Sequence, residues 1–331
     1  MAYAQPGCQS PEKKRLVIYM GQDEKTIMIS VVIPAYNEAG NIKILIQKIS
    51  EQLEEIDSYE IIIVDDGSTD LTLEEIKGVS KHNNSIKYIS FSRNFGHQKA
   101  LKAGIDHTKG DCVISIDADL QHPPELIKEL IMKWREGYDV VYTLRKDSQD
   151  IGLIKKITSK LFYIIINKIA DIDIPLGAAD FRLMDKKVVN ELKKFKENWL
   201  FIRGIVSWLG FNQIGIDYFV QNRRFGLSKY SLKKMVSFAI QGITSFSIMP
   251  LRFSIVIGLI ISVCAFLYLF YALFIRLFFN IAIPGWTSIL ISVLFLGGVQ
   301  LLSIGLIGEY LGKMFIETKN RPNYVIKEIK L

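Results

Sequence analysis

The sequence predicts an α/β domain with a mostly parallel sheet, followed by a hairpin of two membrane-spanning helices. Short apolar runs alternate with stretches of helical periodicity between residues 28 and 228, as in successive strand–helix units. Two long uncharged stretches follow, at 253–275 and 286–308. The charge divides in the same way, because residues 229–331 hold ten basic and three acidic side chains, which is the whole net charge of +7.

The composition excludes several classes of protein. The chain has 331 residues, of which 49% are hydrophobic, and only three cysteines, Cys8, Cys112 and Cys264. A disordered chain, a collagen-like chain and a disulfide scaffold are therefore ruled out, and the isolated cysteines favour a reducing compartment. Because the basic excess lies only in the last third, no nucleic-acid partner is expected.

Residues 28–228 form the predicted domain, and residues 1–27 are expected to be an extension that is either disordered or non-native. The domain begins with an apolar strand at 29–34 and a helix at 41–53, where apolar residues recur at helical spacing. Further strands are predicted at 59–64, 86–91, 112–116 and 139–143, with helices that begin near residues 71, 97 and 124. Continuous apolar strands between helices are typical of a parallel sheet covered on both faces.

Polar segments directly follow the predicted strands. They are residues 34–38, 65–70, 92–99, 117–122 and 145–146. Each one alone could be turn or helix-capping chemistry. Ligands of such sheets bind beyond the carboxyl ends of the strands, however, so five polar segments at one edge indicate a binding site.

The clearest chemistry lies in Asp117-Ala-Asp119. Alternate residues of a strand point the same way, so two carboxylates at a strand end repel each other unless a cation lies between them. Mg²⁺ or Mn²⁺ suits carboxylate oxygens, and Gln121 can add a carbonyl oxygen. Because Mg²⁺ held by few carboxylates completes its shell with water and phosphate oxygens, a nucleotide diphosphate substrate is expected.

Two common nucleotide-binding classes lack their motifs in this chain. A dinucleotide oxidoreductase needs Gly-x-Gly-x-x-Gly after the first strand, where residues 34–39 read Pro-Ala-Tyr-Asn-Glu-Ala. A P-loop NTPase needs Gly-Lys-Ser/Thr, which the sequence does not contain. Hydride transfer and ATP-driven transport are therefore disfavoured.

The last third of the chain is expected to cross a membrane twice. Residues 253–275 carry no charge over 23 positions, and a helix of that length spans about 34 Å. A turn with Pro284 and Gly285 leads to the second span at 286–308. Basic residues flank the outer ends of both spans, which predicts an integral inner or plasma membrane protein with its large domain and both termini in the cytoplasm.

Two amphipathic stretches are candidates for the membrane surface. Residues 229–252 are expected to be an interfacial helix whose lysines meet anionic lipid. Residues 152–170 fit that description and fit equally well a helix that faces the protein core. Residues 309–331 are expected to be a cytoplasmic tail.

Six segments form a specific combination. They are residues 31–38 (Val-Val-Ile-Pro-Ala-Tyr-Asn-Glu), 64–70 (Val-Asp-Asp-Gly-Ser-Thr-Asp), 95–101 (Phe-Gly-His-Gln-Lys-Ala-Leu), 117–124 (Asp-Ala-Asp-Leu-Gln-His-Pro-Pro), 179–184 (Ala-Asp-Phe-Arg-Leu-Met) and 224–230 (Arg-Phe-Gly-Leu-Ser-Lys-Tyr). Together they resemble the family 2 glycosyltransferases of the GT-A fold. Within that family they are most similar to the polyprenyl-phosphate glycosyltransferases, which include dolichol-phosphate mannose synthases and the two-span bacterial bactoprenol glucosyltransferases.

The resemblance implies roles for particular residues. The nucleotide sugar is expected to contact Pro34, Tyr36, Asn37, Glu38, Asp66, Gln98, Lys99, Asp117, Ala118, Asp119 and Gln121, and the acceptor phosphate Arg145, Arg224, Ser228 and Lys229. Asp180 and Arg182 are the implied catalytic pair, and Asp180 is the customary general base. A phosphate monoester with a second pKa of about 6 is already mostly ionised at pH 7, however, so Asp180 could instead position the sugar or an arginine.

The resemblance also implies a reaction and its partners. A sugar is expected to pass, with inversion, from a nucleotide sugar to a polyprenyl phosphate such as undecaprenyl phosphate, for envelope or lipopolysaccharide modification. UDP-glucose is the expected donor, GDP-mannose is the alternative, and a divalent cation is the expected cofactor. A flippase and a further glycosyltransferase of the same pathway are expected downstream. The resemblance leaves undecided whether the protein forms a homo-oligomer.

Two other readings use the same residues. A processive polysaccharide synthase carries Gln-x-x-Arg-Trp, where residues 221–225 read Gln-Asn-Arg-Arg-Phe, and two spans are too few to enclose a polymer channel. A catalytically silent membrane scaffold would have no need of the carboxylates of Asp117 and Asp119. Both readings are therefore disfavoured.

Overall fold

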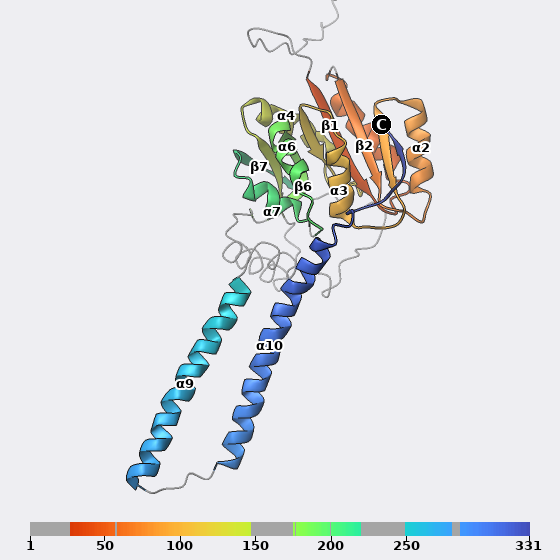
Figure 1. Cartoon of the computed structure of the whole chain (residues 1–331). Coiled ribbons are helices and arrows are strands. Elements are labelled where there is room, and N and C mark those ends of the chain that lie inside the picture. Colours follow the sequence, from red (N-terminus) through yellow and green to blue (C-terminus); the bar gives the residue numbers. More distant parts are fainter. Residues whose placement is uncertain are drawn as a thin grey trace, which may run out of the picture.

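The computed structural model describes residues 27–56, 58–146, 175, 177–198, 200–219, 249–279 and 285–331. Its centre is one eight-stranded sheet with the strand order β7-β5-β6-β4-β1-β2-β3-β8 (Figure 1). The strands are β1 (Met28–Ala35), β2 (Ser58–Asp65), β3 (Ile86–Phe91), β4 (Cys112–Ser115), β5 (Val140–Lys146), β6 (Ala178–Asp185), β7 (Gln213–Phe219) and β8 (Ile326–Lys330). Only β6 and β8 run antiparallel to their neighbours, which confirms the mostly parallel α/β sheet.

Helices cover both faces of this sheet. One face carries α1 (Ile42–Leu53), α2 (Thr72–His82) and α4 (Ile127–Arg135), which follows the short 3₁₀ helix η1 (Pro124–Leu126), and the other carries α3 (His97–Asp106), α6 (Lys186–Lys194) and α7 (Ile202–Trp208). In α1 the buried Leu45, Ile49 and Leu53 recur at helical spacing and face the sheet. The helical pattern read from the sequence is confirmed there.

Alternation along the strands explains why the sheet needs cover on both sides. Val31 and Ile33 of β1 pack into the core beneath α1, whereas Val32 between them packs beneath α3. Gly104 of α3 lies directly over Val32, since a Cβ at Gly104 would be only 2.2 Å from a methyl carbon of Val32. The close approach of α3 to β1 therefore depends on a residue without a side chain.

Two long helices project from the same side of this domain (Figure 1). They are α9 (Met249–Phe279) and α10 (Trp286–Thr318), and both are long and apolar enough to cross a membrane, with mean hydropathies of 2.6 over Met249–Tyr271 and 2.1 over Ile291–Thr318. Large apolar side chains such as Phe253 and Leu301 are exposed along them. Lipid would cover such surfaces.

One expectation needs correction, and three others concern residues that the structure does not describe. Residues 309–331 are not a simple tail, because α10 continues to Thr318 and β8 then joins the sheet. With 33 residues, α10 spans about 50 Å, so its last turns extend beyond a bilayer core of about 30 Å. The extension up to residue 26, the stretch 152–170, and the interfacial segment as far as residue 248 lie outside the described residues.

Candidate active site

The carboxyl ends of β1 to β4 meet at one edge of the sheet, and four of the polar segments follow them there. After β1, Asn37 adopts a left-handed conformation with φ 53°. Its backbone N–H donates to Ser68 Oγ at 3.0 Å, and its side-chain oxygen accepts from the N–H of Thr69 at 2.8 Å. The N–H of Glu38 donates to Thr72 Oγ1 at 2.8 Å. Asn37 and Glu38 therefore join the loops after β1 and β2.

Asp66 joins the next pair of loops. Its buried carboxylate accepts hydrogen bonds from the backbone N–H groups of Phe95, at 2.7 Å, and Gly96, at 2.9 Å. Burial raises the pKa of Asp66, although these two hydrogen bonds and His97 act in the opposite direction. Asp66 thus anchors the loop that leads from β3 into α3, and it lies directly at the polar edge.

A pocket of about 390 Å³ opens at the ends of β1, β2 and β3, which we call the edge pocket. It is lined by Tyr36, Asp65, Gly67, Ser68, Thr69, Leu73, Ser90, Phe91, Ser92, Arg93, Asn94 and Lys327. Tyr36 is the member of this lining that the resemblance implied as a contact of the nucleotide sugar. Pro34 is buried within β1 beside Val64 and does not line the pocket.

The loop after β4 differs from its expected form. β4 ends at Ser115, so Asp117 and Asp119 lie in a turn and not on alternate positions of a strand. Leu120 has φ 59°, and the N–H of Gln121 donates to Asp119 Oδ1 at 3.1 Å. Ala118 is buried beneath this turn. Asp117, Asp119 and Gln121 therefore lie on one short segment at the carboxyl end of β4, with the carboxylate of Asp119 held by the N–H of Gln121.

Two histidines surround Asp117. His97 Nε2 lies 2.9 Å from Asp117 Oδ1, and Nδ1 of the buried His122 lies 3.6 Å from Oδ2. Desolvation would lower the pKa of His97, but the charge and hydrogen bond of Asp117 raise it to about 9. Desolvation likewise would raise the pKa of Asp117, and His97 and His122 hold it below its usual value. A cationic His97 and an anionic Asp117 therefore form an ion pair at neutral pH.

Asp180 forms a second charged centre beside the first. Its buried carboxylate accepts two hydrogen bonds from Arg203 of α7, from Nε at 2.7 Å and Nη2 at 2.9 Å, and a third from Gln98 Nε2 at 3.2 Å. Arg182 Nη2 lies 3.7 Å away, and it also donates to the carbonyl oxygen of Ala179 at 2.9 Å. Desolvation would raise the pKa of Asp180, but Arg203 and Arg182 hold it far below its usual range.

Sequence reasoning missed three of these groups. His97 and His122 lie within the polar segments but received no role, and Arg203 was not singled out at all. Arg203 is 23 positions from Asp180 and on a different element, so only the fold brings the two together. The bidentate geometry holds the guanidinium of Arg203 in one orientation at the rim of the site.

The remaining predicted residues lie at the sides of the site or outside the described chain. Lys99 is half-buried at the start of α3, and burial together with nearby Arg93 lowers its pKa. Arg145 is exposed at the end of β5, and its backbone N–H donates to the carbonyl oxygen of Gly177 at 3.0 Å. The expected acceptor residues Arg224, Ser228 and Lys229 lie outside the described residues.

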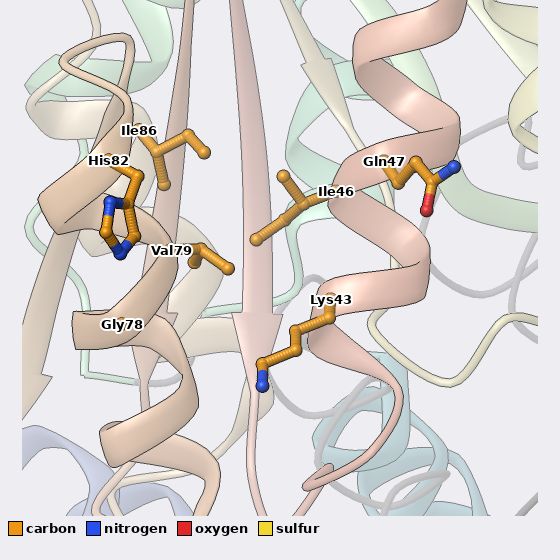
Figure 2. A pocket seen from close by; sticks show the side chains of 7 residues that line it. All are labelled: Lys43, Ile46, Gln47, Gly78, Val79, His82 and Ile86. Carbon is orange, nitrogen blue, oxygen red and sulfur yellow. The ribbon is translucent and has the colours of Figure 1, made fainter.

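A second pocket, of about 410 Å³, lies between α1 and α2. Figure 2 shows Ile46 of α1 and Val79 of α2 facing each other across it. Ile86, the first residue of β3, also lines it, so it lies toward the amino ends of the strands. It contains none of the predicted site residues, and the edge pocket is the better candidate for a substrate.

Gly67 shapes the edge pocket. A Cβ at Gly67 would lie 2.4 Å from the carbonyl carbon of Arg93, and its φ of +68° is one that side chains disfavour. Gly67→Ala is therefore expected to destabilise the protein by about 1–3 kcal/mol, seen as a lower melting temperature in detergent. Gly78→Ala in α2 meets nothing within 4 Å and is the control, with an unchanged or higher melting temperature. A G67A protein that melts like the wild type contradicts this close approach.

The mostly parallel α/β sheet, covered by helices on both faces, is that of the GT-A fold, and it is joined to two helices that are long and apolar enough to cross a membrane. The chain belongs to glycosyl transferase family 2, whose profile matches residues 30–193. It is therefore a glycosyltransferase.

Relatives match nearly the whole chain. It is 44% identical to the uncharacterized glycosyltransferase sll0501 of Synechocystis, over 92% of this chain and 96% of that protein. It is 41% identical to the putative glycosyltransferase CsbB of Bacillus subtilis, over 92% of each chain. The bactoprenol glucosyl transferase of Shigella phage SfX is 42% identical, over 91% of this chain and 99% of its own.

Proposed function

We propose that this glycosyltransferase moves glucose from UDP-glucose to undecaprenyl phosphate, with inversion at the anomeric carbon. The observation that carries the proposal is the similarity to the bactoprenol glucosyl transferase of Shigella phage SfX over 99% of that protein's length. A match of that extent includes the two apolar helices as well as the α/β domain. The name of this relative specifies a glucosyl group, which favours glucose over mannose.

The placement of the site supports a lipid acceptor. A polyprenyl chain stays in the bilayer and presents its phosphate at the headgroup level. The end of α10 reaches the α/β domain, since Glu317 accepts hydrogen bonds from the N–H of Asn198 at 2.8 Å and from its Nδ2 at 3.1 Å. The pKa of Lys99 is lowered by burial, and the negative charge of Glu317 partly opposes this lowering. Glu317 is therefore near Lys99. The polar edge therefore lies close to the end of a helix that could cross the membrane.

The basic flanks of the two helices support one orientation. Arg252 lies in the first turn of α9, and Lys313 and Lys319 lie at the end of α10. Because positive charges remain on the cytoplasmic side, the α/β domain and the C-terminus would face the cytoplasm. That side also holds nucleotide sugars.

The reaction joins two anions. An oxygen of the lipid phosphate attacks the anomeric carbon, and the bond from that carbon to the diphosphate oxygen breaks, so the electron pair leaves with UDP. Cationic groups must therefore face both the acceptor phosphate and the leaving diphosphate. Arg203 of α7 lies beside Asp180 and is partly exposed, and Arg145 is exposed at the end of β5, whereas Arg182 is buried next to Asp180.

The residues after β4 offer oxygen donors for a divalent cation. Within the described part of the chain, no three His, Cys, Asp or Glu side chains lie together in a way that could hold a metal ion. In this proposal, Asp117 and Asp119 share such an ion with the carbonyl oxygen of Gln121, water and the diphosphate, a donor set that suits Mg²⁺ or Mn²⁺. The bound ion would act as a Lewis acid toward the leaving diphosphate.

Asp180 is better suited to positioning than to proton transfer. Three hydrogen bonds and two arginines stabilise its charged form, whereas an efficient general base has a pKa near the working pH. The acceptor phosphate, with a second pKa of about 6, is already mostly ionised at neutral pH. Asp180 would therefore orient Arg203, and the acceptor would attack without a protein base.

A donor panel tests the proposal. Purified full-length protein, Mn²⁺ or Mg²⁺ and undecaprenyl phosphate are expected to give a glucosyl lipid from UDP-glucose, identified by its mass. UDP-galactose and GDP-mannose are expected to react at least about tenfold more slowly. A higher rate with GDP-mannose would identify mannose, and not glucose, as the transferred sugar. The absence of a lipid product from every donor would contradict the proposed function.

A further inference from the structure

The chain returns from α10 to the α/β domain and completes its sheet. Seven residues separate Thr318, the end of α10, from Ile326, the start of β8. β8 pairs antiparallel with β3, so that Ile326 lies beside Phe91 and Lys330 beside Tyr88. Because the two strands run in opposite directions, the first residues of β8 lie at the carboxyl end of β3, which is the edge that carries the site.

Side chains fasten this returning segment to the domain. Glu328 accepts from Lys77 Nζ of α2 at 2.6 Å and also from the hydroxyl of Tyr88. Lys330 Nζ donates to Ser80 Oγ at 2.9 Å. These contacts fix the register of β8 against β3 and α2.

The segment before β8 is fastened as well. The ring of Tyr324 stacks on Phe91, with centroids 4.9 Å apart. Asn323 Nδ2 donates to the carbonyl oxygens of Lys196, at 3.2 Å, and Glu197, at 3.0 Å. With the Glu317 contacts to Asn198, the whole path from α10 to β8 is attached to the α/β domain. Its geometry at the site edge is therefore set by the fold.

Lys327 is the residue of β8 that lines the edge pocket. Its neighbour Glu328 is committed to Lys77 and Tyr88, whereas Lys327 is exposed on the pocket wall with Tyr36, Gly67 and Arg93. An ammonium group supplies three hydrogen-bond donors and no acceptor. The pocket wall thus gains a donor from a segment that lies beyond both apolar helices in the sequence.

The strand order indicates which part of a nucleotide this donor would meet. Asp117 follows β4, and β1, β2, β3 and β8 succeed it across the sheet. Strands lie about 4.8 Å apart, so the ends of β4 and β3 are separated by about 14 Å. If the diphosphate lies near Asp117, as the proposed function requires, the nucleoside extends over β1 and β2 and its base reaches the edge pocket.

We propose that Lys327 is a donor-binding residue that hydrogen-bonds a carbonyl oxygen of the nucleotide base. This inference rests on the proposed function and extends it to the base end of the donor. Uracil presents two ring carbonyl oxygens that can accept from an ammonium group. The C-terminal strand therefore completes the nucleotide pocket, and the same covalent segment connects that pocket to α10.

Nucleotide affinity of the full-length protein in detergent tests this role. Lys327→Ala is expected to weaken UDP binding by about 5- to 15-fold, the loss of one hydrogen bond from a charged donor. Uridine, measured by competition, should lose affinity by the same factor. Lys330→Ala is the matched control, because it removes a lysine of the same strand that contacts Ser80 and does not line the pocket. It should bind UDP within about twofold of wild type.

Each outcome decides the inference. Unchanged UDP affinity in K327A overturns it, and a loss confined to UDP and absent for uridine overturns contact with the base. An equal loss in K330A shows a general effect of β8 and also overturns it. Binding of UDP, GDP, CDP and ADP to the wild-type protein distinguishes a failure of the Lys327 inference from a failure of the proposed function. If the wild type prefers GDP or CDP, UDP-glucose is wrong and K327A is measured with that nucleotide. A preference for ADP, whose base has no carbonyl oxygen, overturns the inference, and a wild type that binds none of the four overturns both.

Discussion

Asp119→Asn is expected to lower turnover with UDP-glucose by about 100- to 1,000-fold, the loss of several kcal/mol of charge stabilisation at the leaving diphosphate. Asn has the same shape as Asp and keeps an oxygen that can accept from the N–H of Gln121, so the turn after β4 should survive. What disappears is one of the two negative charges that would hold a divalent cation. Initial rates at increasing Mn²⁺ measure both the lower rate and the weaker dependence on metal.

A carboxylate at the opposite edge of the sheet provides the control. Asp139 precedes β5, at the amino end of that strand, and pairs with Lys187 at 2.6 Å. Asp139→Asn should therefore leave turnover within about twofold of wild type. Turnover that is unaffected by Asp119→Asn would show that this residue is not part of the site. Full activity in excess chelator would show that the reaction needs no divalent cation.

The strands of the nucleotide-binding half could be predicted from the sequence because they are buried on both faces. β1 and β2 read as continuous apolar runs, and nearly all of their residues are buried. The polar segments after them could be recognised because a parallel sheet brings the carboxyl ends of its strands to one edge. Pattern and topology agree in this half of the domain.

β6 and β8 could not be predicted in the same way. β6 contains Asp180 and Arg182, and two charged residues at alternate positions suggest an exposed face. Both side chains are buried, because each compensates the charge of the other and Arg203 joins them. β8 is short and largely exposed, and it becomes a strand because β3 offers an unpaired edge. Such pairings depend on partners that are remote in the sequence.

The ion pairs of the site were unpredictable for a related reason. His97 begins α3 after β3, and Asp117 lies in the loop after β4, and these two strands are separated in the sheet by β2 and β1. Sequence spacing shows that both residues are at the same edge but not that their side chains meet. Their contact at 2.9 Å depends on how α3 begins and on the left-handed turn at Leu120.

Asp180→Asn is expected to lower kcat by about 100-fold while the KM for UDP-glucose changes much less. The substitution removes the charge that balances Arg203 and Arg182 and releases the guanidinium of Arg203 from its bidentate contact. A displacement of about 1 Å in a positioning group can cost about 100-fold in rate. Breaking a buried ion pair also destabilises by about 3–5 kcal/mol, so the melting temperature must be measured beside the rate.

The pH dependence separates positioning from general-base catalysis. The pKa of Asp180 in the folded protein lies below its usual value of 3.8, so its contribution to stability is present above that pH and is lost only as the pH falls through the lower value. It therefore stays ionised throughout the working range and should add no acidic limb to the rate profile. A limb from the acceptor phosphate, at about pH 6, should be the same in wild type and in Asp180→Asn.

Two further variants complete this test. Arg203→Lys keeps the positive charge but cannot donate two parallel hydrogen bonds, so it should lower kcat in the same direction as Asp180→Asn with a smaller loss of stability. Asp106→Asn removes the partner of Lys102, a comparable ion pair on α3, and should lower the melting temperature while kcat is retained. An acidic limb that is present in wild type and absent in D180N would identify Asp180 as a base. An unchanged kcat in D180N would show that neither role belongs to this residue, and the orientation of Arg203 would then have no part in the transfer.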